Sequence, residues 1–160
     1  MTAKYTVIDS VTLTSSAASV TFSSIPQTYR DLVLVVDGSA SSGTAGLRVS
    51  FNNDTGANYN AVRMYGNGST ATSDSFSNFS GGIVSSFSMT TSNAILAIQT
   101  MDYSSTDKHK SYLVRGNDSA QGTNAVAGRW ANTASVTTLN FYSSNNTFAI
   151  GSTFRLLGVN

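Results

Sequence analysis

The chain contains Asp31-Leu32-Val33-Leu34-Val35-Val36-Asp37-Gly38-Ser39, in which five apolar residues stand together between polar ends. Leu and β-branched Val in a short run bounded by Asp and Gly are typical of a β-strand. A run of this length is far shorter than the roughly 20 apolar residues that cross a bilayer as a helix. The same holds for Ala94 to Ile98, so we predict two strands here and expect no membrane partner.

Away from this run, apolar and polar residues alternate along most of the chain, with breaks of Gly, Ser, Asn and Asp. Alternation with a period of two indicates half-buried strands, and helical periodicity is hard to find. The predicted strands are about Tyr5 to Leu13, Ser19 to Phe22, Asp31 to Ser39, Leu47 to Phe51, Asn60 to Tyr65, Ile83 to Met89, Ala94 to Asp102, Ser111 to Arg115, Ala125 to Trp130, Ser135 to Tyr142 and Ser152 to Val159.

Many short strands separated by turn residues favour an all-β fold, and 160 residues with 40% hydrophobic content suit one core. We therefore predict a single domain over residues 1–160, built as a two-sheet antiparallel jelly-roll-like sandwich. Pro26, the one proline, lacks an N–H group and is expected in the connection before Asp31.

Residue types that perform covalent chemistry are scarce in this composition. There is no Cys, no Glu and one His, only 11% of the residues are charged, and the net charge is +1. Nucleic-acid binding requires clustered Lys and Arg, whereas the nine basic residues here are scattered. We expect a binding or structural protein without catalytic residues, cofactor, metal or nucleic-acid partner.

His109 is the one imidazole, and it stands between Lys108 and Lys110 in an expected loop. Two ammonium neighbours would disfavour its protonation, which suits a base, but no nucleophile-elbow motif accompanies it. The eight acids are all Asp and fall mostly at expected strand ends or turns, where Asp bonds to nearby backbone. An exposed loop histidine and turn-forming aspartates account for these residues without catalysis.

Oxygen-bearing side chains crowd the stretch from Phe51 to Tyr59 around Gly56. Calcium prefers such oxygen ligands, yet Asp54 is the one carboxylate and the spacing does not match an EF-hand loop. A calcium loop and a hydrogen-bonded β-turn are the two interpretations, and the turn is the one we expect.

Two further features bear on ligand binding. Five aromatic residues could stack on sugars or fill the core instead: Trp130, Tyr65, Tyr103, Tyr112 and Tyr142. The polar, glycine-bearing segment Gly66 to Gly82 is predicted to be a long loop and the first place for a partner contact. Gln121 to Asn124 and Ser143 to Asn146 are predicted turns.

Three segments together resemble small β-sandwich virion proteins of tailed bacteriophages, in particular the head-decoration, or cement, proteins. The segments are Phe22 to Leu32, Phe51 to Tyr59 and Gly151 to Val159. They are structural motifs without a catalytic residue, and their order and spacing extend the likeness over nearly the whole chain.

The resemblance implies a protein that trimerises on the outer surface of a capsid, contacts the phage major capsid protein and stabilises the shell. It also implies synthesis in the host cytoplasm and residence in the virion. The alternative is a receptor-binding module of tail-fibre or tailspike type, with host-surface carbohydrate as its ligand. The polar segment from Gly66 to Gly82 and the supply of Tyr and Trp motivate that alternative.

Overall fold

The computed structural model describes residues 4–85 and 88–160, and it contains twelve strands and no helix over those residues. All strand pairs are antiparallel. The strands are β1 (Tyr5–Thr12), β2 (Ser19–Phe22), β3 (Asp31–Gly38), β4 (Leu47–Phe51), β5 (Tyr59–Gly66), β6 (Ala71–Phe79), β7 (Gly82–Ile83), β8 (Ala94–Met101), β9 (Lys110–Asp118), β10 (Gly122–Trp130), β11 (Leu139–Ser143) and β12 (Thr153–Val159).

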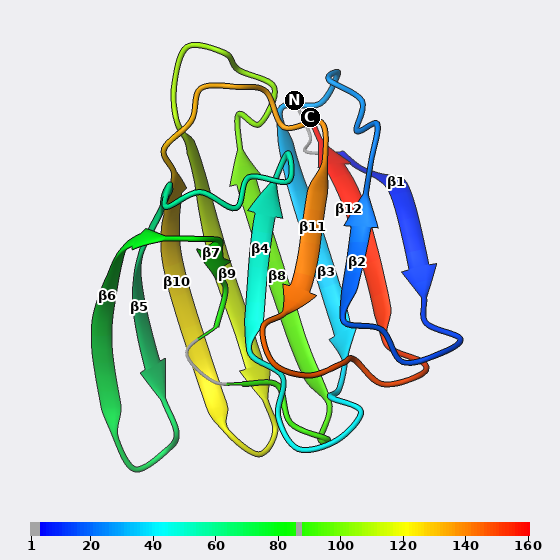
Figure 1. Ribbon diagram of the computed structural model, residues 1–160, viewed down its shortest axis with the longest axis vertical. Helices are drawn as coiled ribbons and strands as arrows, with labels where there is room; N and C mark the ends of the chain where they lie inside the picture. The colour runs from blue at the N-terminus through cyan, green and yellow to red at the C-terminus, as the bar shows by residue number, and fades with distance from the viewer. Residues whose placement is uncertain (1–3, 86–87) are drawn as a thin grey trace.

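These strands form two sheets of unequal width. The large sheet has eight strands in the order β1-β12-β3-β8-β9-β10-β5-β6, and the small sheet has four in the order β2-β11-β4-β7. The chain crosses between the sheets repeatedly, from β1 through β5, from β6 through β8 and again from β10 through β12, which gives a jelly-roll-like sandwich. In Figure 1 the small sheet lies against one face of the large sheet, and β5 and β6 extend beyond it. The predicted fold class is therefore confirmed.

The core lies between the two sheets and follows from the alternation of the sequence. On β3 the residues Leu32, Leu34 and Val36 are each 0% exposed and point toward the small sheet. They join one cluster with Phe51 and Phe141 from that sheet. Because successive strand residues point to opposite faces, the residues between them face the other way. Pro26 lies in the β2–β3 connection as expected, and its carbonyl accepts a hydrogen bond from the Tyr103 hydroxyl.

The segment Gly66 to Gly82 is not a loop. It is the end of β5, a tight turn at residues 67–70 and the nine-residue strand β6. The prediction missed β6 because this edge strand is exposed at every position except the half-buried Phe76, so its sequence shows no apolar alternation. Arg63 on β5 fixes the hairpin, since its Nε lies 2.6 Å from Asp74 Oδ1 and its guanidinium lies 4.5 Å from the centre of the Phe76 ring.

The predicted strand from Ser135 to Tyr142 begins only at Leu139. Before it, Asn52 takes the place of a neighbouring strand: its Oδ1 accepts hydrogen bonds from the backbone N–H groups of Thr137 (2.8 Å) and Thr138 (3.1 Å). Its Nδ2 donates to the Ser135 carbonyl at 2.7 Å. Backbone groups satisfied by a side chain need no strand partner, so the segment stays irregular.

Two other predicted boundaries were wrong. Of the expected strand from Ile83 to Met89, the structure shows a short ladder at Gly82–Ile83, which pairs with Arg48 and Val49 of β4, and an isolated bridge between Met89 and Ala45. Residues 86–87 of that prediction lie outside the described residues. The expected turn from Gln121 to Asn124 belongs largely to β10, which starts at Gly122 with a φ of 124° that glycine adopts readily.

Gly128 on β10 makes room for a large ring of the neighbouring strand. The ring of Tyr112 on β9 lies against the Gly128 backbone, and a Cβ at Gly128 would overlap it. The Tyr112 hydroxyl continues to the small sheet, where it donates to the Ile83 carbonyl at 3.3 Å. Tyr112 is 0% exposed, so it has no alternative space.

We predict that Gly128→Ala lowers the free energy of unfolding by about 1–3 kcal/mol, because the added methyl group displaces a buried ring in a closely packed core. Chemical denaturation measures the change. Gly66→Ala is the matched control, since its Cβ would meet only the Thr70 carbonyl at an ordinary 3.6 Å. If the two variants had equal free energies of unfolding, the Tyr112 ring would not require glycine at position 128.

Candidate binding surface

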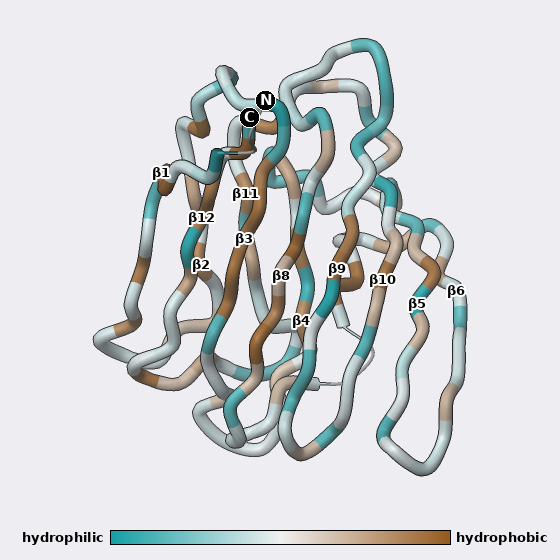
Figure 2. The backbone as a smooth tube through the Cα atoms, turned by 180° about the vertical axis from the view of Figure 1, so that it is seen from behind, coloured by the Kyte–Doolittle hydropathy of each residue, from teal (hydrophilic) through white to brown (hydrophobic). Residues whose placement is uncertain are grey.

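The outer face of the large sheet, which the small sheet does not cover, carries two apolar rows across the strands. In the first row the register places side by side Val7, Leu157, Val33, Gln99, Leu113, Ala127 and Val62. In the second row the neighbours are Arg155, Val35, Ala97, Arg115, Ala125 and Met64. We call these two rows the apolar band; Figure 2 views the molecule from this side, with apolar residues on β3 and β8.

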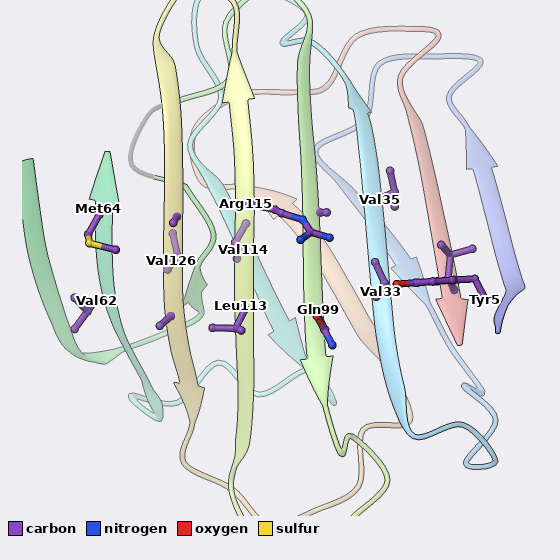
Figure 3. Close-up of a pocket in the computed structure, with 14 residues that line it drawn as sticks. Tyr5, Val33, Val35, Val62, Met64, Gln99, Leu113, Val114, Arg115 and Val126 are labelled. Atoms are coloured by element: carbon purple, nitrogen blue, oxygen red, sulfur yellow. The ribbon is translucent and has the colours of Figure 1, made fainter. Parts of the chain in front are cut away.

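The band coincides with a shallow hollow of about 570 Å³. Small side chains, Ala97, Ala125 and Ala127, line its middle, whereas Tyr5 lies at the β1 end and Met64 at the β5 end. Figure 3 shows these ends on opposite sides of the strands that form the floor. The low floor between larger side chains gives the face its concave shape.

Large apolar side chains of the band are open to solvent. Met64 is 61% exposed, Val62 55% and Leu113 46%, and Tyr5 at the rim is 60% exposed. Large apolar side chains that stand together in solvent on one face are typical of interaction surfaces. The band is therefore the candidate binding surface of this protein.

Polar groups interrupt the band: Arg115 and Gln99 near its centre, Arg155 on β12, and the Tyr5 hydroxyl at the β1 end. Figure 3 shows Arg115 reaching from β9 over β8, where Gln99 stands, and Tyr5 reaching from β1 toward Val33. Gln99 is held in place, since its Nε2 donates to Asp31 Oδ2 at 3.0 Å. Within residues 4–85 and 88–160, the Arg115 guanidinium has no hydrogen bond or ion pair. The hollow thus offers the unpaired positive charge of Arg115, whereas Arg155, in the same row on β12, does not line the hollow.

The oxygen-rich stretch from Phe51 to Tyr59 is a hydrogen-bonded turn. Asp54 Oδ2 accepts hydrogen bonds from Trp130 Nε1 (2.6 Å) and Asn58 Nδ2 (2.8 Å), and its Oδ1 accepts one from the Gly56 N–H (2.8 Å). Because the Asp54 carboxylate already accepts hydrogen bonds from three N–H donors, its role is to hold Trp130 against the turn. Across the described part of the chain, no three or more His, Cys, Asp or Glu side chains gather in a way that could hold a metal ion.

These hydrogen bonds set the charge state of Asp54. Burial by itself would raise the pKa of this carboxyl group, but the donors on Trp130, Asn58 and Gly56 favour the carboxylate and hold the pKa below its ordinary value of 3.8. The turn is therefore stabilised by an ionised group.

His109 lies exposed in the β8–β9 connection, as expected. Its neighbour Lys108 pairs with Asp102, with Nζ 2.9 Å from Oδ2, and Lys110 is buried with its Nζ donating to the carbonyls of Lys108 (2.9 Å) and Thr133 (3.1 Å). Burial lowers the pKa of Lys110. The lysines thus stabilise the connection, and neither pairs with His109.

Most of the aromatic residues considered for sugar stacking are in the core. Trp130, Tyr103 and Tyr112 are at most 1% exposed, and only Tyr65 and Tyr142 are half-buried. Trp130 instead packs with Phe51, whose ring centre lies 5.6 Å away. Tyr5, the exposed aromatic residue beside the band, was not among the predicted candidates.

Comparison with known proteins identifies no family. No protein-family model and no curated protein matches the chain. An exo-inulinase from Aspergillus awamori is similar at 14% identity and a TM-score of 0.45, over 96% of this chain but 29% of the inulinase. A Caenorhabditis elegans galectin, LEC-6, is similar at 9% identity and a TM-score of 0.40, over 94% of this chain and 95% of the galectin. In the described residues, no helix is long and apolar enough to span a membrane.

We predict that Asp54→Ala lowers the free energy of unfolding by about 2 kcal/mol at pH 7, because the buried indole N–H of Trp130 loses its acceptor. The folded-state pKa of Asp54 is depressed, so its contribution is present above the unfolded pKa near 4 and is lost as pH falls through the folded pKa. Denaturation at pH 7 and pH 3 should therefore show the difference between wild type and variant shrinking at low pH.

Asp107→Ala is the control for this substitution, because Asp107 is exposed and its side chain accepts a hydrogen bond from the hydroxyl of Ser105 rather than from a buried donor. We expect its effect to stay within about 0.5 kcal/mol. An Asp54→Ala effect of that size would show that the turn does not depend on the carboxylate.

Proposed function

We propose that this protein is a structural protein of a tailed-phage virion, of the head-decoration type, which attaches to the shell of major capsid protein and stabilises it. The apolar band is the observation that carries the proposal. It spans seven strands of one rigid sheet and exposes large side chains, as an attachment surface for another protein does. The resemblance of the three sequence segments to head-decoration proteins supplies the identity of the partner.

Attachment would stabilise the shell by mass action. A protein that binds only the assembled form favours it by RT ln(1 + [L]/Kd), or about 4 kcal/mol per site at a thousandfold excess over Kd. Several sites per oligomer would raise the effective affinity further, since the second contact becomes intramolecular.

The oligomer we propose is a trimer, which uses a heterologous contact between two different patches of the chain. The β6 edge of the large sheet suits such a contact. β6 is a nine-residue edge strand without Lys or Pro, the residues that commonly block edge pairing. β1 at the opposite edge carries an irregularity between Val7 and Asp9, which interrupts edge pairing, so the proposed contact joins β6 to a different patch. Light scattering should give three times the 16.7 kDa chain mass, whereas a monodisperse monomer at micromolar concentration would reject the trimer.

We predict that Val62→Asp and Met64→Asp each weaken attachment to shells at least about tenfold, because an uncompensated carboxylate replaces an apolar contact at the interface. Both residues are more than half exposed, so folding should be retained. The measurement is co-sedimentation with empty shells assembled from the major capsid protein, together with mass spectrometry of intact virions.

Ile150→Asp is the matched control for this pair. Ile150 is 70% exposed in the β11–β12 connection and does not line the hollow. Absence of the chain from virions, or unchanged attachment of both band variants, would overturn the proposed function.

A further inference from the structure

The dimensions of the apolar band restrict what can occupy it. From β1 to β5 it crosses six inter-strand gaps, or roughly 29 Å at about 4.8 Å per gap, and its two rows lie two residues, or roughly 7 Å, apart. The flanking rows carry more polar residues. One contains Asp37, Asn117 and Thr123 beside the apolar Ile95, and the other contains Asp31, Ser111 and Arg129 beside Met101, with Val159 and Tyr5 at its β12 and β1 end. A long, narrow apolar strip between polar margins fits one elongated segment.

Arg115 restricts the occupant further. Its guanidinium stands over the floor of the hollow, and any molecule that lies along the band covers it. Removing water from a charged group costs free energy unless an opposite charge and hydrogen bonds replace it. Gln99 and Tyr5 add hydrogen-bonding capacity close by but no negative charge. The missing partner of Arg115 must therefore come with the occupant.

A second copy of this chain does not meet that requirement. Stacked face to face, it would bring the same two rows, which contain Arg115 and Arg155 and no carboxylate. The contact would then bury guanidinium groups against apolar side chains or against each other. The charge pattern of the band thus disfavours self-association through this face.

We infer that the band receives an apolar segment of the shell protein that carries one carboxylate, which forms an ion pair with Arg115 while the apolar side chains lie over Val33, Leu113 and Met64. The assignment of the segment to the shell rests on the proposed function. The chemistry of the occupant, an apolar body with a single carboxylate, rests on the band alone.

The chemistry is tested on the isolated chain with decanoate and decyltrimethylammonium, each below its critical micelle concentration. Amide chemical shifts followed by NMR give the affinity and the residues affected. Decanoate should bind along the band more tightly than the cation, and Arg115→Gln should weaken decanoate binding about fivefold, the size of one exposed ion pair. Arg115→Lys should recover part of the loss.

Arg129→Gln is the matched control, because Arg129 is exposed on the same face but lies in a flanking row and its Nη2 donates to Asn60 Oδ1 at 3.3 Å. Its decanoate affinity should stay within about twofold of wild type. Equal binding of the two amphiphiles, or an unchanged affinity of Arg115→Gln, would overturn the inference.

Shell binding separates this inference from the proposed function. If shells bind the chain, Arg115→Gln should weaken attachment and decanoate should compete with it. If decanoate binds in an Arg115-dependent way but shells do not bind, the chemistry of the band stands and the phage assignment fails. If shells bind and Arg115→Gln attaches as well as wild type, the function stands and the carboxylate pairing is wrong.

Discussion

The width of the two sheets is unequal, and this constraint determines both the core and the binding surface. Four strands can cover only one face of an eight-stranded sheet. On that face alternate residues of β3 and β8 pack against Phe51 and Phe141 and are sealed from water. On the other face the large apolar side chains of Val62, Leu113 and Met64 stay 46% to 61% exposed. The same strands therefore pack one face of the large sheet into the core and leave the other face open as a contact surface.

Polar side chains at the ends of the sandwich hold, by hydrogen bonds, connections that have no strand partner. Asp54 ties Trp130 to a turn 76 residues earlier in the sequence, and Asn52 holds the backbone before β11. Asn52 replaces the backbone hydrogen bonds of an absent strand neighbour, whereas Asp54 satisfies the buried indole N–H of Trp130. With the connections fixed in this way, the large sheet can stay rigid under its exposed face, which preorganises a contact surface.

Alternation in the sequence was sufficient to predict the all-β sandwich, because half-buried strands dominate it. It could not reveal β6, whose polar residues see solvent on both sides, or the irregular segment before Leu139, whose bonding depends on Asn52 from another part of the chain. A signal for the outer face was present: the unbroken run Leu32 to Val36 is apolar on both faces of its strand, as in strands covered on both sides. The sequence does not indicate that Arg115 lies over the hollow, because that position follows from the strand register alone.

The first and last strands are neighbours: Tyr5 pairs with Val159, and the Asn160 N–H donates to the Lys4 carbonyl at 3.3 Å. Figure 1 shows β1 and β12 side by side at one edge of the large sheet. A short peptide could join them, and new ends could then be opened at the exposed turn of residues 67–70 without removing a strand. Such a circular permutant would carry fused cargo beside the β6 edge, far from the rim formed by Tyr5.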